Sequence, residues 1–151
     1  MESYKHIVVA TDFTEFSENA VERAVSLAKL CDAELTLLHV VEQFPVHMYG
    51  EYFPTEDVDP WKYATEDSKK RLQQLAERTE YSKTKLLTEV TQRSAKHEIV
   101  RVAREVKADL VVTGTHGRSG LKALLGSVAE GVVHLAPCEV LVVRRQTADE
   151  T

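Results

Sequence analysis

Cysteine is scarce in this chain, and its placement excludes two kinds of chemistry. The only cysteines among the 151 residues, Cys31 and Cys138, lie far apart in the sequence. They do not form the CxxC pair that is typical of a thiol redox centre or of half a zinc site. We expect both to be reduced thiols with a structural role.

Long hydrophobic runs are absent too. No stretch of about 18 consecutive apolar residues occurs, so no segment has the composition of a membrane-spanning helix. The amino-terminal residues include Glu2 and lack the apolar core of a secretory signal peptide. We expect a cytoplasmic protein that has no membrane partner.

Positive charge is outnumbered by negative charge. The chain has 19 Lys and Arg residues against 24 Asp and Glu residues, which gives a formal net charge of −5 and a pI near 5.7. A protein with this net charge repels the phosphates of nucleic acids. We expect no nucleic-acid partner.

Motifs for catalysis and for metal binding are missing as well. A G-x-S-x-G nucleophile elbow does not occur, and the histidines show no H-x-x-x-H spacing. His39 lies inside an apolar run and is expected to be a hydrogen-bonded core residue, whereas His116 is expected to be a solvated loop residue. We therefore expect no catalytic residue and no metal-binding residue.

What the chain does have is a globular composition and a regular series of apolar runs. Hydrophobic residues make up 43% and charged residues 28%, which at this length predicts one domain over residues 1–151. The runs predict five strands, at His6–Ala10, Leu35–Val41, Lys85–Val90, Asp109–Thr113 and Val140–Val143. The third run is the most polar, so an edge position in the sheet is expected for it.

Apolar residues at helical spacing predict a helix between each pair of strands. The predicted helices are Ala20–Cys31 capped by Ser17, Trp61–Thr79, the stripe Ile99–Val106 after Ser94, and Leu121–Leu135 before Pro137. The segment Glu42–Pro60 is expected to be a long surface loop, either functional or a tolerated insertion. The alternation predicts an α/β fold with an open parallel sheet and helices on both faces. In such sheets ligands bind beyond the carboxyl ends of the strands.

The most informative stretch is a run of glycines after the fourth strand. Gly114–Gly120 reads G-T-H-G-R-S-G, and Gly126-Ser127 follows at the head of a predicted helix. Glycines let backbone N–H groups approach a phosphate, and Ser127 with Glu130 matches the capping box of a helix N-terminus, where anions bind. Arg118 and the Ser119 hydroxyl would add further donors. The alternative is that these glycines only shape a tight turn.

Two better-known phosphate motifs do not fit this spacing. Neither the G-x-x-x-x-G-K-[ST] loop nor the G-x-G-x-x-G fingerprint occurs. Asp12 ends the first strand at the same edge of the predicted sheet. Its carboxylate either accepts a hydrogen bond from a ribose hydroxyl, approaches a phosphate-bound cation, or caps a turn.

Together these residues resemble the universal stress protein family. The segments that carry the resemblance are Ile7–Asp12, Leu37–Val40, Asp109–Arg118, Leu125–Val128 and Ala136–Val143. The T-H-G-R and G-S-V motifs are its most specific part. The resemblance covers nearly the whole chain, whereas Glu42–Glu80 matches only in length and character.

The resemblance implies a Rossmann-like fold with strand order 3-2-1-4-5, a homodimer through the last strand, and a regulatory role in the stress response with a client protein of unknown identity. It also implies a site for ATP or AMP, with Mg²⁺ held by the phosphates. Asp12 would lie near the ribose or the metal, and the backbone of Val40 would contact adenine. The implied site residues are Ala10, Thr11, Asp12, Val40, Thr113, Gly114, Gly117, Arg118, Ser119, Gly126, Ser127 and Val128.

One departure from the family pattern leaves the function open. ATP-binding members carry G-x2-G-x9-G-[ST], whereas only eight residues, Arg118 to Leu125, separate Gly117 from Gly126. The phosphate loop is therefore one residue shorter here. Two alternatives to an ATP- or AMP-binding regulator remain, namely a nucleotide-free dimeric interaction protein of the same fold and a slow ATPase.

Overall fold

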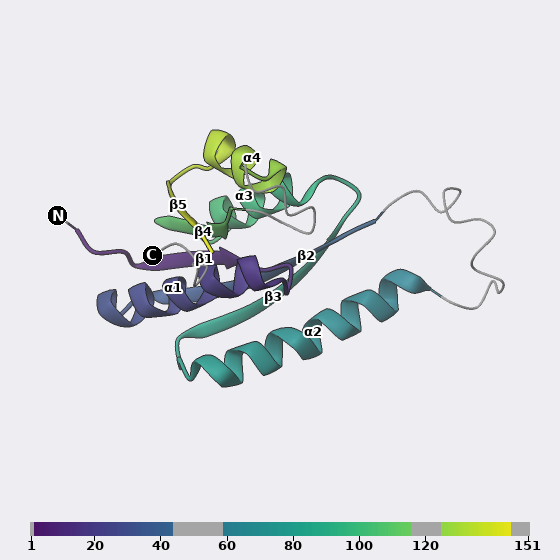
Figure 1. Cartoon of the computed structure of the whole chain (residues 1–151), viewed down its shortest axis with the longest axis horizontal. Helices are drawn as coiled ribbons and strands as arrows, with labels where there is room; N and C mark the ends of the chain where they lie inside the picture. Colours follow the sequence, from purple (N-terminus) through teal and green to yellow (C-terminus); the bar gives the residue numbers. More distant parts are fainter. Residues whose placement is uncertain (1, 44–58, 116–124, 146–151) are drawn as a thin grey trace.

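The computed structural model describes residues 2–43, 59–115 and 125–145 of the chain. Within these residues the elements follow in the order β1 (His6–Ala10), α1 (Glu15–Cys31), β2 (Glu34–Glu42), α2 (Pro60–Thr79), β3 (Thr84–Thr91), α3 (Ala95–Glu105), β4 (Leu110–Gly114), α4 (Ser127–Leu135) and β5 (Glu139–Val143). All neighbouring strands are parallel, and the sheet has the order β3-β2-β1-β4-β5 (Figure 1). The predicted fold class, strand order and edge position of the third strand are confirmed.

Helices cover both faces of the sheet. In Figure 1, α3 and α4 lie above the sheet, and α1 and α2 lie below it. Because side chains alternate in direction along a strand, Ile7 and Val9 of β1 pack with residues of α1 and α2, whereas Val8 packs with residues of α3 and α4. The central strands β1 and β4 are thus buried on both faces, which explains their unbroken apolar sequences.

The start of α1 differs from the prediction. The helix begins at Glu15 with Thr14 as its N-cap, so Ser17 lies inside the first turn and is buried. Its hydroxyl donates to the Thr14 carbonyl oxygen. The prediction that Ser17 caps the helix is wrong, because a serine in the first turn can bond to a backbone carbonyl instead of capping.

The start of α4 also differs. Gly126 is the N-cap and Ser127 is the first helical residue, with no side-chain hydrogen bond at the cap. A capping box needs its serine at the N-cap and its glutamate at the third helical position, whereas Glu130 stands at the fourth. The predicted capping box is therefore wrong. Leu125 precedes the helix, and Leu121 and Leu124 of the predicted stripe lie outside the described residues.

The start of α2 has a side-chain cap that the sequence analysis did not predict. Asp59 accepts from the backbone N–H groups of Trp61 at 3.0 Å and Lys62 at 3.3 Å. Pro60 occupies the first helical position, where its missing N–H costs nothing. Pro60 thus belongs to α2 and not to the predicted loop, and residues 44–58 of that loop lie outside the described residues.

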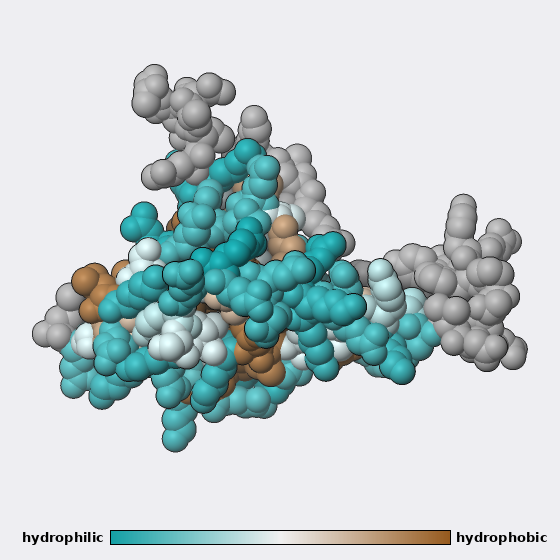
Figure 2. All heavy atoms as spheres, turned by 90° about the horizontal axis from the view of Figure 1, so that it is seen from below, coloured by the Kyte–Doolittle hydropathy of each residue, from teal (hydrophilic) through white to brown (hydrophobic). Residues whose placement is uncertain are grey.

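The face seen in Figure 2 is mostly hydrophilic, with hydrophobic side chains in small groups. No helix in the part of the chain that the structure describes is both long and apolar enough to cross a bilayer.

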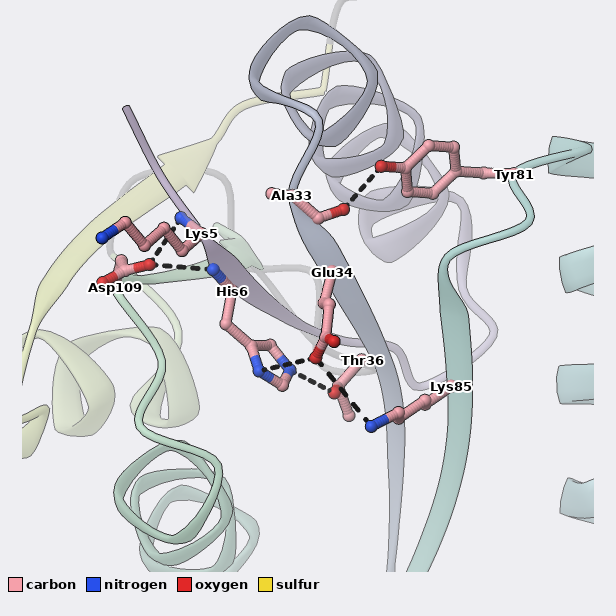
Figure 3. Close-up of polar contacts among 8 residues, drawn as sticks. All are labelled: Lys5, His6, Ala33, Glu34, Thr36, Tyr81, Lys85 and Asp109. Carbon is pink, nitrogen blue, oxygen red and sulfur yellow. Dashed lines mark hydrogen bonds and ion pairs between the residues drawn. The ribbon is translucent and has the colours of Figure 1, made fainter. Parts of the chain in front are cut away.

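A cluster of polar side chains joins three strands at their amino ends (Figure 3). The backbone N–H groups of Lys5 and His6 donate to Asp109 Oδ2 at 2.6 and 2.8 Å, which ties β1 to the start of β4. The His6 ring lies 2.8 Å from Thr36 Oγ1 through Nε2, and its Nδ1 lies 3.6 Å from Glu34 Oε2. The imidazole is therefore held between two side chains of β2.

Burial lowers the pKa of His6, and the Glu34 carboxylate opposes this only in part. The side chain is 13% exposed. Above about pH 6.5 His6 is neutral in both the folded and the unfolded chain. Below that pH the unfolded chain takes up the proton first, so His6 lowers the free energy of unfolding as the pH falls.

We predict that, when the pH is lowered from 7.5 to 5.5, the free energy of unfolding of His6→Gln falls by less than that of the wild type. Urea denaturation of both proteins at the two pH values measures this. A stability difference between them that is the same at both pH values would show that His6 titrates normally in the folded protein. If the wild type instead gains stability relative to His6→Gln at pH 5.5, the pairing of His6 with Glu34 outweighs the effect of burial.

Candidate functional site

A cavity of about 630 Å³ opens at the carboxyl ends of β1, β2 and β4. The strands and the turns after them contribute residues 10–13, 39–42 and 113–115. The remaining walls come from α2, from Ala95 and Ile99 of α3, and from residues 126–129 at the start of α4. This is the edge at which ligands bind in open α/β sheets.

Most residues of the sequence-predicted site line this one cavity. They are Ala10, Thr11, Asp12, Val40, Thr113, Gly114, Gly126, Ser127 and Val128. The other three, Gly117, Arg118 and Ser119, lie outside the described residues. The fold thus brings together segments that are separated by most of the chain.

Thr11 links the end of β1 to β2 beside the cavity. Its backbone N–H donates to the Leu38 carbonyl oxygen at 2.9 Å, and its own carbonyl oxygen lies 2.7 Å from Nδ1 of His39. Because a carbonyl oxygen can only accept, Nδ1 of His39 carries the proton. His39 is therefore hydrogen-bonded, as the sequence analysis expects, but it also lines the cavity.

The Thr11 hydroxyl belongs to a directed chain of hydrogen bonds. Ser17 uses its proton on the Thr14 carbonyl oxygen, so the Thr11 hydroxyl must donate to Ser17 Oγ, 3.0 Å away. Thr11 Oγ1 in turn accepts from the Phe13 N–H at 3.0 Å. Successive hydrogen bonds of this kind strengthen one another in a buried setting. The chain explains why Ser17 is buried although it does not cap α1.

Asp12 caps the turn that leads into α1. Its Oδ1 accepts from the Thr14 N–H at 3.0 Å and from the Thr14 hydroxyl at 2.5 Å. The turn-capping alternative is thus present in the structure. Because Asp12 also lines the cavity, this carboxylate is held in place beside any ligand there.

Phe13 has an unusual backbone conformation for an aromatic residue. Its φ is 64°, in the left-handed region, where an L-residue loses roughly 1–2 kcal/mol. Its ring lies 4.6 Å from the His39 ring, and the Arg71 guanidinium lies 5.4 Å from its centroid. An aromatic pair contributes about 0.5–1.5 kcal/mol and an exposed cation–π contact about 0.5–1 kcal/mol. Together these contacts offset the strain.

The wall formed by α2 was not anticipated from the sequence. Trp61, Ala64, Asp67, Ser68 and Arg71 line the cavity at the spacing of one helix face. Asp67 Oδ2 lies 3.1 Å from Arg71 Nε and so orients the guanidinium. The helical spacing was visible in the sequence, but which side of the helix faces the cavity depends on how α2 packs on the sheet.

Gly114 has a structural role that its sequence motif does not suggest. It is the last residue of β4 and is buried. A Cβ atom there would lie 2.8 Å from the carbonyl oxygen of Phe16 and 3.1 Å from its carbonyl carbon. The glycine is therefore required by the close approach of the first turn of α1, whether or not it also faces a ligand.

The charges of the described wall are mainly negative. Asp12, Glu42 and Asp67 line the cavity, and Arg71 is paired with Asp67. Among the described residues, no group of three His, Cys, Asp or Glu side chains could hold a metal ion.

Comparisons with known proteins agree with this fold. A sequence model described as "Universal stress protein family" matches residues 3–144. Universal stress protein A homolog 1 of Coxiella burnetii is 34% identical over 93% of this chain and 96% of its own length. A universal stress protein of Methanocaldococcus jannaschii is 37% identical over 94% of this chain and 83% of its own length. A solved structure of a universal stress protein in complex with cAMP is 25% identical, with a TM-score of 0.71, and covers 93% of this chain and 97% of that one.

We predict that Gly114→Ala lowers the free energy of unfolding by about 1–3 kcal/mol, because the methyl group overpacks against the α1 backbone. Gly131→Ala is the matched control. The atoms nearest to its Cβ would all belong to the Lys96 side chain, which can rotate away, and alanine favours the interior of α4 by up to about 1 kcal/mol. Urea denaturation compares the two. Equal stability of both variants would show that α1 can move away from β4 at little cost.

Proposed function

Because the chain belongs to the universal stress protein family, we propose that its cavity binds an adenine nucleotide and that the protein acts as a nucleotide-dependent regulator in the stress response. The proposed ligand is ATP or AMP. When a triphosphate is bound, Mg²⁺ is held mainly by its phosphates.

One feature of the sheet supports a base-binding position more than any other. The pairing of β1 with β2 ends at Ala10, opposite Leu38, whereas β2 continues to Glu42. Beyond Leu38 no described strand pairs with the β1 side of β2. The backbone of Val40 therefore faces the cavity at an open strand edge, where the polar edge of a purine can bond as an added strand would.

The other groups of the site suit the rest of a nucleotide. The Asp12 carboxylate is an acceptor for a ribose hydroxyl. Ser127 and Val128 begin α4, whose free N–H groups suit a phosphate, and Ser127 adds a hydroxyl. Gly114 and Gly126 also line the cavity, and Gly117, Arg118 and Ser119 would complete the phosphate contacts. The related protein solved in complex with cAMP supports an adenine nucleotide as the ligand class.

We also propose that residues 1–151 form a single domain in the cytoplasm. Every described strand belongs to one sheet, which supports a single domain. Cys31 and Cys138 are both unpaired, and burial raises the pKa of the Cys138 thiol. Free thiols suit a compartment in which cysteines stay reduced.

The prediction from this function is that AMP or Mg²⁺-ATP raises the melting temperature. A ligand at about one hundred times its dissociation constant stabilises the folded state by about 2.7 kcal/mol, which corresponds to roughly 5–10 °C for a domain of this size. Differential scanning fluorimetry with AMP, ATP with and without Mg²⁺, and GMP as the control measures it.

The matched variant is Ala95→Phe, which places a ring in the cavity. It should fold and should lose the nucleotide-induced shift, since Ala95 lines the cavity. If millimolar AMP and ATP both leave the wild-type melting temperature unchanged, the protein is instead a nucleotide-free member of the family. Equal shifts with GMP and AMP would contradict an adenine site.

We further propose a homodimer through β5. The strand lies at one edge of the sheet, and Val140 to Val143 are partly exposed. Val133 and Leu135 of α4, which packs beside β5, are 48% and 44% exposed. An apolar edge with unpaired backbone groups favours pairing with another chain, and a two-fold axis makes such a contact self-complementary.

Val142→Lys is predicted to convert the dimer into a monomer. The two-fold axis would place one lysine charge from each subunit in the same apolar contact. Val90→Lys on β3, at the opposite edge of the sheet, is the control and should leave the dimer intact. Light scattering at tens of micromolar gives the molar mass. A monomeric wild type, or a folded Val142→Lys variant that is still dimeric, would rule out this interface.

A further inference from the structure

We propose that Phe13 and Arg71 set the ligand class of the cavity by positioning Asp12 to select ribonucleotides over deoxyribonucleotides. This inference rests on the proposed function, because it concerns the same site. It assigns a role to a side chain of α2 and to a strained residue, neither of which belongs to the predicted set of site residues.

The first step is that the turn after Asp12 needs support. Phe13 adopts a φ of 64°, which glycine or asparagine would adopt more readily than an aromatic residue. Strained residues of this kind persist only where the surrounding structure holds them. The position of Asp12 therefore depends on what holds Phe13.

The second step is that the support comes from three sides. The His39 ring of β2 lies 4.6 Å from the Phe13 ring, and the Arg71 guanidinium of α2 lies 5.4 Å from its centroid. The Phe13 N–H donates to Thr11 Oγ1 at 3.0 Å. The side chain is held between a strand and a helix, and the backbone is held by the turn itself.

The third step concerns the carboxylate. Oδ1 of Asp12 accepts both the Thr14 N–H and the Thr14 hydroxyl, which fixes the orientation of the group. No described residue donates to Oδ2. Because Asp12 lines the cavity, its second oxygen can accept from a ligand hydroxyl. A fixed, charged acceptor penalises an analogue that lacks the hydroxyl, since the acceptor then loses its partner.

The fourth step explains why Arg71 is the residue that acts from α2. Asp67, one turn earlier, lies 3.1 Å from Arg71 Nε and orients the guanidinium over the Phe13 ring. The pair is largely exposed, so its own contribution to stability is small. Its effect on the site is geometric, because the guanidinium packs over the ring that follows Asp12.

The experiment measures ligand selectivity and not affinity alone. Isothermal titration of AMP, 2′-deoxy-AMP and 3′-deoxy-AMP is carried out on the wild type, Phe13→Ala, Arg71→Gln and Phe13→Tyr. The control is Arg78→Gln, on the same helix, whose partner Glu18 lies 3.8 Å away and which does not line the cavity.

We expect the wild type to bind AMP about tenfold or more tightly than one of the deoxynucleotides, as the loss of a hydrogen bond to a charged group requires. Phe13→Ala and Arg71→Gln should bring that ratio towards one. Phe13→Tyr and Arg78→Gln should keep it. A purely structural role for the stack would lower all three affinities together and leave the ratio unchanged.

The failures can be told apart. A wild type that binds none of the three nucleotides overturns the proposed function, and this inference with it. A wild type that binds AMP and both deoxynucleotides equally overturns the inference alone. The inference alone is also overturned if Arg71→Gln and a folded Phe13→Ala keep the wild-type ratio of affinities. If Phe13→Ala does not fold, Arg71→Gln carries the test, because an exposed side chain can be changed without loss of the core.

Discussion

The turn from β1 into α1 is the constraint on which the cavity depends. Thr11 uses its backbone N–H on Leu38, its carbonyl oxygen on His39, and its hydroxyl on Phe13 and Ser17. These bonds join β1, β2 and α1 at a buried point. Since an unpaired polar group in such a place costs free energy, each bond also fixes the position of its neighbours. The Asp12 carboxylate owes its orientation to this turn.

The cavity joins the two layers of helices. Arg71 and Trp61 approach from the layer below the sheet in Figure 1, whereas Val128 and Ile99 approach from the layer above it. They meet because β2 continues beyond the end of β1 and leaves its edge open. A ligand at this edge would touch both layers, so its binding would stabilise their arrangement.

The fold could be predicted closely because strands and helices are indicated by short patterns along the chain and by the order in which those patterns alternate. Apolar runs such as Ile7–Ala10 reveal strands that are buried on both faces, and their alternation with helices leaves few possible topologies. The predicted helix starts are wrong where two nearby residues could each serve as the N-cap. Ser17 and Ser127 both resemble helix caps, but Thr14 and Gly126 hold those positions. The side chain of Ser17 bonds within the turn instead, which only the packed structure reveals.

The sequence by itself determined the order of the strands, the edge where the cavity opens, and the segments that line it from β1, β2, β4 and α4. The edge follows from hydrophobic periodicity, whereas the strand order and the lining segments were implied by the resemblance of local motifs to the universal stress protein family. Only the tertiary structure decided that Gly114 makes room for Phe16, that Arg71 covers Phe13, and that His39 faces the cavity. The partners in these contacts lie far apart in sequence. Their distances depend on how α1 and α2 pack against the sheet, and no local pattern specifies that packing.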